Sequence, residues 1–282
     1  MNKLLLIDGH NLLFQMFFGM PARILNKKNK PIHAVIGFIG ALLKIINIIN
    51  PTHISVIFDG ETGSNRVEVN SDYKANRIDY TEVPDNENPF SQLSDIKKAL
   101  EYMGIKHCET INVETDDIMA GYANTYGNDM KIVISSSDTD FLQLVNKNVF
   151  MFVYRGKSSI LYDEKNVMNK FGIKPDVFVD YKSLVGDNSD NIKGVPKIGP
   201  KTAVRLINEF GKVESILKHI DEITSKSIKE ALNNNKEKLR ENLVLIRLNG
   251  DSRLPFEVSE LEWRNNVEEL ATMKILKHID VL

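Results

Sequence analysis

Three short apolar runs in this chain each lead into an aspartate, and this repeated pattern constrains the fold more than any other feature. The runs are KLLLI before Asp8, HISVIF before Asp59, and KIVIS shortly before Asp138. A short continuous apolar run that ends in a turn is typical of a parallel strand buried on both faces. Because ligands of open parallel sheets bind outside the carboxyl ends of the strands, we expect these aspartates to share one crevice.

Amphipathic helices alternate with these runs. Residues 34–50 place apolar side chains at three-to-four spacing before Pro51, and residues 93–103 repeat the pattern. The alternation ends with a strand pair around Gly156, NVFMFVYRG and SSILYD, and from about Asp163 the chain is helical and loop-rich. The sequence therefore predicts an α/β fold with a twisted, mainly parallel sheet flanked by helices, followed by a helical region.

Carboxylates gather at the predicted strand ends and in two further clusters, ETDD and GDNSD. The candidates are Asp8, Asp59, Glu114, Asp116, Asp117, Asp138, Asp140, Asp187 and Asp190. Oxygen ligands without His or Cys favour Mg²⁺ or Mn²⁺, and the single cysteine, Cys108, excludes a cysteine-based zinc site. Two such ions roughly 4 Å apart clamp an in-line displacement at phosphorus. For residues 114–117 the alternative is simple complementarity to a helix dipole, and for Asp8 it is a helix N-cap.

The stretch 183–203 joins an acidic turn to the sequence GVPKIGPKTA. Gly194 and Gly199 have the spacing of a phosphate-binding P-loop, but Pro200 precedes Lys201 and no apolar strand comes before the turn. A helix-hairpin-helix element fits better, because its glycines let the turn approach a phosphodiester backbone and its helix amides face phosphates. An ordinary helical hairpin with glycine caps remains the alternative.

Two segments are candidates for contact with nucleic acid. The polar connection from 61 to 89 contains SDYKANR, whose Tyr73, Lys74 and Arg77 offer an aromatic ring and two cations to a strand; a solvated loop is the alternative. Residues 193–240 carry a net charge of +5, against −2 for the whole chain, and an electrostatic contact with DNA is expected there. A solvated basic face explains the same charge.

Nothing in the sequence predicts secretion or membrane insertion. The apolar stretch LLLI is too short for a signal peptide, and the longest apolar run, GFIGALLKIINIIN, contains Lys44 and two asparagines. One cysteine also excludes a disulfide framework. We expect a soluble, cytoplasmic protein with no membrane partner.

Six motifs, taken in order, resemble one family over nearly the whole chain. LLLIDGHN, FDG, DYKANR, ETDD, SDTDFLQLV and GDNSDNIKGVPKIGPKTA resemble the bacterial and phage 5′-nucleases, the flap endonucleases that also form the N-terminal 5′→3′ exonuclease domain of DNA polymerase I. Since no polymerase sequence follows before Leu282, the chain resembles the stand-alone members. The resemblance implies a PIN-like catalytic α/β domain over 1–172, with a helical arch at about 64–90. It implies a helical DNA-binding region over 173–282, with a helix–three-turn–helix module of the helix-hairpin-helix type at about 184–211.

The same resemblance assigns roles to single residues. The first metal site would comprise Asp8, Asp59, Glu114, Asp116 and Asp117, and the second Asp138, Asp140, Asp187 and Asp190. Lys74 matches the arch lysine that approaches the scissile phosphate, Arg77 a nearby arginine, and Tyr73 a stacking residue. The expected catalytic set is Lys74, Arg77, Asp116 and Asp138. The hairpin expected to hold DNA comprises Gly194, Val195, Lys197, Ile198, Gly199, Lys201 and Thr202.

The implied function is structure-specific hydrolysis of DNA, with 5′-flap endonuclease and 5′→3′ exonuclease activity in replication or repair. The expected cofactors are two or more Mg²⁺ or Mn²⁺ ions, with K⁺ between hairpin carbonyls and a DNA phosphate. DNA is the expected partner of a monomer that uses no small-molecule cofactor. The alternatives are a PIN-type ribonuclease and a structure-specific DNA-binding protein without activity.

The sequence departs from the family pattern at three places. Gln15 replaces the usual arginine and removes an expected phosphate contact. Ser136 and Ser137 replace Thr-Gly, and Thr115 replaces the alanine of EADD. None of these changes removes an expected metal ligand.

Overall fold

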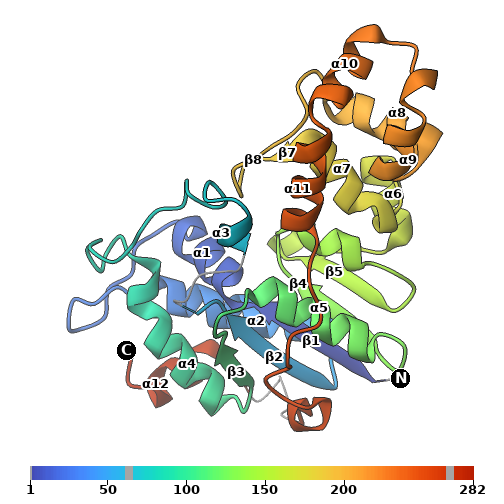
Figure 1. The fold of residues 1–282 in the computed structure, drawn as a ribbon. Coiled ribbons are helices and arrows are strands. Elements are labelled where there is room, and N and C mark those ends of the chain that lie inside the picture. Colours follow the sequence, from blue (N-terminus) through green and yellow to red (C-terminus); the bar gives the residue numbers. More distant parts are fainter. Residues whose placement is uncertain (1, 61–65, 265–269) are drawn as a thin grey trace.

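A six-stranded sheet forms the centre of the protein, for which the computed structural model describes residues 2–60, 66–264 and 270–282 (Figure 1). The strand order is β3-β2-β1-β4-β5-β6, and every neighbouring pair is parallel except β5 and β6. In chain order the strands are β1 (Lys3–Asp8), β2 (His53–Phe58), β3 (Lys106–Glu109), β4 (Lys131–Ser135), β5 (Val149–Val153) and β6 (Ile160–Tyr162). The predicted parallel sheet and its closing strand pair are confirmed.

Helices cover both faces of the sheet. Successive residues of β1 point to opposite sides and are apolar on both, so each face must be buried. Leu4 and Leu6 belong to one core cluster with helix α5, whereas Leu5 and Ile7 belong to the other. The second cluster lies under α1 (Gly9–Gly19), α2 (His33–Ile49), α4 (Leu93–Tyr102) and α12 (Thr272–His278). On the first face lie α5 (Thr115–Tyr126) and the 3₁₀ helix η2 (Thr139–Leu144).

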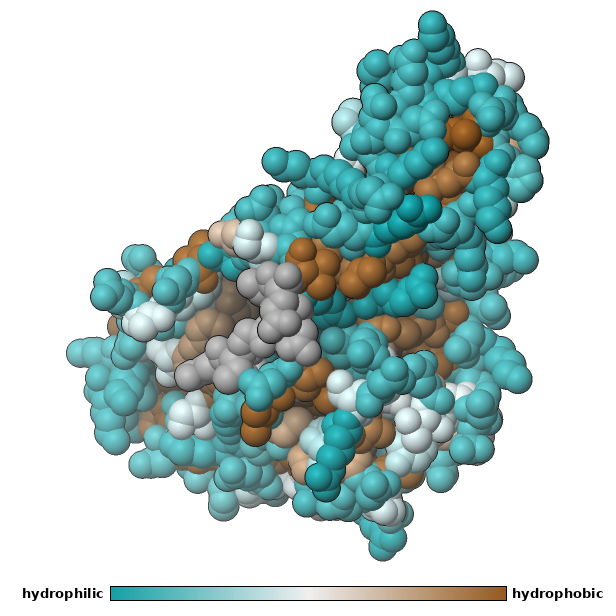
Figure 2. Space-filling view, viewed as in Figure 1, coloured by the Kyte–Doolittle hydropathy of each residue, from teal (hydrophilic) through white to brown (hydrophobic). Residues whose placement is uncertain are grey.

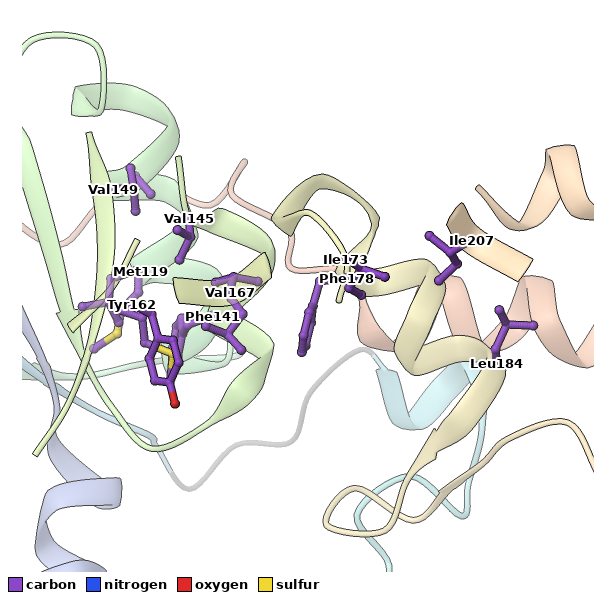
Figure 3. Packing of buried hydrophobic residues seen from close by; sticks show 14 of the residues in the cluster. Met119, Phe141, Val145, Val149, Tyr162, Val167, Ile173, Phe178, Leu184 and Ile207 are labelled. Carbon is purple, nitrogen blue, oxygen red and sulfur yellow. The ribbon is translucent and has the colours of Figure 1, made fainter. Parts of the chain in front are cut away.

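The C-terminal helices extend from one side of the sheet. They comprise α6 (Glu164–Phe171), α7 (Phe178–Val185), α8 (Pro200–Phe210), α9 (Val213–Lys218), α10 (Lys226–Asn234) and α11 (Lys236–Ile246), with the two-stranded hairpin β7 (Gly186–Asp187) and β8 (Ile192–Lys193) between α7 and α8. Figure 3 shows the core running from Phe141 and Val167 through Ile173 and Phe178 to Leu184 and Ile207. The sheet and these helices therefore share one core.

The chain beyond α11 returns to the sheet. It runs beside α5, where the Tyr122 hydroxyl donates to the Phe256 carbonyl (2.8 Å), and passes through η6 (Val258–Leu261). The Trp263 indole then donates to the Met103 carbonyl at 3.0 Å. The last part of the predicted region 173–282 therefore packs on the sheet layer through these contacts.

The predicted helical arch at about 64–90 is largely not helical in its described part. One four-residue helix, α3 (Arg66–Val69), is followed by turns up to η1 (Pro89–Gln92), and residues 64 and 65 lie outside the described ranges. The physical reason is the polar, asparagine-rich sequence, which lacks an apolar face of helical period and places Lys74 at a φ of 56°.

Hydrophilic residues cover most of the face drawn in Figure 2, and apolar residues appear on it in separate patches.

The remaining 3₁₀ helices are η3 (Gly156–Ser158), η4 (Pro175–Val177) and η5 (Ile220–Glu222). Among the described residues, no helix has the length and apolar character needed to cross a membrane.

Candidate functional site

One serine joins the Asp8 carboxylate to the backbone amide of Asp138 at the carboxyl edge of the sheet. Asp8 caps α1, with Oδ1 accepting from the Asn11 amide (3.0 Å) and Oδ2 from the Ser136 hydroxyl (2.8 Å). The Ser136 oxygen in turn accepts from the Asp138 amide at 3.0 Å. Asp8 is thus both a helix cap and a crevice residue, and Ser136, a departure from the family pattern, connects it to Asp138.

Asp59 follows β2 at the same edge. Its Oδ1 accepts from the Thr115 amide at 2.9 Å, and its Oδ2 lies 3.7 Å from His10 Nδ1. Burial alone raises the pKa of Asp59, but hydrogen bonds from His10 and Thr115 lower it below its ordinary value. This carboxylate is therefore held in its charged form.

Asp116 completes a sheet-edge group that consists of Asp8, Asp59, Asp116 and Asp138. Burial, followed by the charges of Asp138, Asp8 and Asp59, raises the pKa of Asp116 well above its usual range. Burial and the charges of Asp59 and Asp138 raise the pKa of Asp8 to about 7. Like charges in one crevice resist ionising together, so a bound cation is the natural counter-charge.

A second group lies beside it, built from η2 and the β7–β8 turn. Carboxylate oxygens of Asp140, Asp187 and Asp190 all lie within 4.8 Å of one another, the only such trio among the described residues. Burial raises the pKa of Asp140 to about 7, although the ammonium of Lys182 opposes the shift. Three hard oxygen donors at this spacing suit a divalent cation such as Mg²⁺ or Mn²⁺.

Lys182 was not foreseen from the sequence. This lysine of α7 is 6% exposed, and its ammonium contacts Asp140 Oδ1 and Asp187 Oδ2. Burial by itself lowers the pKa of Lys182, but the charges of Asp140 and Asp187 outweigh this effect and raise the pKa to well above its ordinary value. The available signal was a lysine in the helical run FVDYKSLV that leads to GDNSD.

The arch brings three cations to these carboxylates. Lys74 Nζ lies 2.9 Å from Glu114 Oε2, and Arg77 Nη2 lies 3.2 Å from Asp190 Oδ1. Arg66 of α3 is buried and bridges Glu114 Oε2 (2.5 Å) and Asp117 Oδ1 (2.7 Å).

Asp117 is the second carboxylate that pairs with Arg66. Its Oδ1 also accepts from the Asn249 amide at 2.7 Å, so the same oxygen joins α5, the arch and the chain that leaves α11. The predicted metal ligand is therefore occupied by protein donors. Gln15, at the family's arginine position, donates to the Tyr154 carbonyl at 2.7 Å.

Tyr73 does not form the predicted exposed stacking surface. Its side chain is 5% exposed and packs with Val179, Ile192 and Leu245, while its hydroxyl donates to Glu114 Oε2 at 3.2 Å. The physical reason is the docking of the arch on α11 and the hairpin, which buries the ring.

The predicted DNA-contacting hairpin divides into buried and exposed residues. Val195 and Ile198 are each 4% exposed, and their side chains pack in the core. A Cβ at Gly194 would lie 2.3 Å from the Val185 backbone, so this glycine is required by the protein's own packing. Gly199, Lys197 and Lys201 are exposed, and Thr202 is half-buried at the start of α8.

Two family models together match most of the chain. The first, described as "5′-3′ exonuclease, N-terminal resolvase-like domain", matches residues 3–172, and the second, "5′-3′ exonuclease, C-terminal SAM fold", matches residues 173–269. The 5′-3′ exonuclease of Aquifex aeolicus is 31% identical, with 99% of this chain and 96% of that protein covered.

Longer relatives match over part of their length. Thermostable DNA polymerase I of Thermus caldophilus is 34% identical over 93% of this chain, and DNA polymerase I of Bacillus subtilis is 32% identical over 97%. The chain spans about 30% of the length of these polymerases.

Solved structures share the fold. A bacteriophage T5 flap endonuclease, in a complex with DNA and metal ions, superimposes with a TM-score of 0.72 at 23% identity and covers 99% of this chain and 100% of that one. The catalytic core of Rad2, in complex with DNA substrate, gives 0.59 at 16% identity, with 99% of this chain and 93% of that one covered. The predicted fold class is confirmed by these likenesses.

Proposed function

The chain belongs to the 5′-3′ exonuclease family, and from this premise we propose that it is a metal-dependent nuclease that hydrolyses DNA at 5′ ends and 5′ flaps. The carrying observation is the sheet-edge group, four carboxylates that meet beside a second, tightly spaced trio. The flap endonuclease of bacteriophage T5, which shares the fold, has been crystallised with DNA and metal ions.

We propose that the crevice binds two or more Mg²⁺ or Mn²⁺ ions. Asp8, Asp59 and Asp116 would hold the first with Glu114, and the trio of Asp140, Asp187 and Asp190 would hold the second. Asp138, predicted in the second site, would be shared between the two, since its charge acts on both Asp116 and Asp140. Such ions polarise a phosphoryl oxygen and activate water when bound. The chemistry of the donors supports this assignment, because all are hard oxygens and four carry no lysine or arginine partner in the described chain.

The cations of the arch have a separate proposed task. Lys74 and Arg77 would leave Glu114 and Asp190 when substrate enters, and stabilise the charge that builds on the scissile phosphate. Asp116 and Asp138 would act with them as the catalytic carboxylates.

We propose that the hairpin and the start of α8 position the DNA backbone. Gly199 caps α8 with open space around it, and Lys197 and Lys201 are exposed nearby, so phosphates can approach the helix amides. The hairpin carbonyls would hold K⁺ against a phosphate. The proposed division at 172/173 places most of the basic helices in the second part. We expect a monomer because one chain supplies every proposed ligand. We also expect a cytoplasmic location.

A cleavage assay on a 5′-flap substrate tests the proposal. Asp138→Ala with Asp140→Ala is expected to abolish cleavage in Mg²⁺ and Mn²⁺ while DNA binding is largely kept. Wild-type cleavage by this double variant would overturn the mechanism. Preferential cleavage of single-stranded RNA would favour a PIN-type ribonuclease, and binding without metal-dependent turnover in the wild type would favour a DNA-binding protein.

A further inference from the structure

Two turns face each other where the arch meets the hairpin. The arch turn spans residues 72–77, and the hairpin turn spans residues 188–191, between β7 and β8. Besides the side-chain bonds from Arg77 and Tyr73 to the Asp190 carboxylate, three hydrogen bonds to backbone groups join them: Lys74 N donates to Asp190 O (3.1 Å), Asn191 Nδ2 to Asp72 O (2.8 Å) and Asn76 Nδ2 to Asn188 O (3.1 Å). Each of these three bonds has a backbone group on at least one side, so the contact sets the relative position of the two chain segments.

Both turns contain a residue in the left-handed region. Lys74 has a φ of 56° and Asn191 a φ of 57°. Asparagine visits this region readily, whereas lysine does so rarely, and such a conformation persists where its surroundings determine it. The backbone amide of Lys74 donates to the Asp190 carbonyl, so the hairpin turn helps to hold the lysine in this conformation.

The same contact places charged side chains. From the arch turn, Lys74 reaches Glu114 (2.9 Å) and Arg77 reaches Asp190 (3.2 Å). Beneath the turns, Tyr73 packs with Ile192 of β8 and closes the contact on its buried side. The positions of the arch cations are therefore set by contact with the β7–β8 hairpin, which carries Asp187 and Asp190, and not by the arch alone.

We propose that Asn76 and Asn191 are positioning residues for the nuclease reaction. They fasten the arch turn to the hairpin turn, so that the Lys74 ammonium keeps a set position relative to Asp187 and Asp190. The inference rests on the proposed function, in which Lys74 acts on the scissile phosphate. Neither asparagine is needed as a ligand or as a DNA contact for this role.

Two substitutions remove the asparagine side-chain bonds and spare the charges. Asn76→Ala removes one donor, and Asn191→Gly removes the other while it keeps the positive φ accessible. Asn166→Ala is the matched control, because this exposed asparagine of α6 also donates to a backbone carbonyl, that of Leu161 (2.9 Å).

The combined variant is expected to lose about tenfold in kcat on a 5′-flap substrate, as a displaced catalytic group should. Its KM is expected to stay within about twofold and its thermal midpoint within about 4 °C, since exposed hydrogen bonds contribute little to stability. The control should match the wild type. In a Lys74→Ala background the combined substitution should cause no further loss, because its effect passes through the lysine.

The outcomes separate this inference from the proposed function. An unchanged kcat in the combined variant, an equal loss in the control, or a full further loss in the Lys74→Ala background would overturn the inference alone. Wild-type cleavage by Lys74→Ala itself would overturn the proposed role of the lysine, and the inference with it.

Discussion

The two groups of carboxylates differ in what balances their charge. Each member of the outer group, Glu114, Asp117, Asp140, Asp187 and Asp190, has a lysine or arginine within ion-pair distance. In the part of the chain that the structure describes, the sheet-edge group has no such partner, and only His10 lies near Asp59.

The difference teaches how the chain keeps an acidic crevice folded. Lys182 pairs with Asp140 and Asp187, Arg66 pairs with Glu114 and Asp117, and each cation joins elements that are distant in the sequence. The sheet-edge group relies on backbone amides, Ser136 and His10, so protons or a bound cation must relieve the rest of its repulsion. Cation binding should therefore depend most on the sheet-edge group, and structural stability on the outer group.

Removing a sheet-edge charge should have the largest effect on activity. Asp116→Asn keeps the volume but withdraws a carboxylate from the centre of the group, and cleavage is expected to fall by about 10³-fold or more, as for loss of a main electrostatic contributor. Single-turnover cleavage with a Mg²⁺ titration measures this. Asp95→Asn, which removes an exposed partner of Lys98 on α4, is the control and should cleave normally. Equal loss in both variants would contradict the comparison.

Removing the outer group's buried cation should have the largest effect on stability. Lys182→Met leaves Asp140 and Asp187 buried without their partner, and the free energy of unfolding is expected to fall by about 3–5 kcal/mol. Urea denaturation in EDTA measures the loss, and added Mg²⁺ should restore part of it. Lys98→Met breaks an exposed pair and is expected to cost at most about 1 kcal/mol. Similar losses for the two lysines would remove the distinction.

The pH dependence of the metal-free protein should report Asp8 of the sheet-edge group together with Asp140 of the outer group. The pKa of Asp8 is about 7 in the folded protein against 3.8 without the fold, so between these values the folded state binds more protons. Stability is then expected to fall as pH rises from about 4 to 7, by up to about 1.4 kcal/mol per pH unit for one group. Urea titrations across this range in EDTA should show a shallower slope for Asp8→Asn. An unchanged slope would assign the dependence to other groups.

The smallest effect is expected at Ser136, which joins Asp8 to Asp138. Ser136→Ala removes both hydrogen bonds and should lower the free energy of unfolding by about 1 kcal/mol, with a modest loss of kcat. Ser136→Thr keeps the hydroxyl and should behave as the wild type. Equal behaviour of the two variants would show that the hydroxyl does not organise the sheet edge.

Much of the fold and of the acidic crevice was predictable because the signals are local. An apolar run followed by Asp8 or Asp59 specifies a buried strand and places its carboxylate at the strand's end. Parallel pairing then brings the strand ends together without further information. The helix-hairpin-helix element was predictable for the same reason, since its glycines and Pro200, which begins α8, lie within a few residues.

The partners of the outer group were not predictable from such signals. Lys182 lies 42 residues from Asp140, and Arg66 lies 48 residues from Glu114. Their pairing depends on how α7 and the arch pack against the sheet, which no short window of sequence records. The same packing buries Tyr73, Val195 and Ile198, which in sequence resemble contact residues.

By itself, the sequence determined the strands, their order of appearance and the residues that supply oxygen donors, because period and turn chemistry act over a few neighbours. Only the tertiary structure decided which carboxylates carry their own counter-charge and which depend on a bound cation. That choice arises where the arch, the hairpin turn and α7 meet the sheet edge, since ion pairs form only between groups that packing has already brought together.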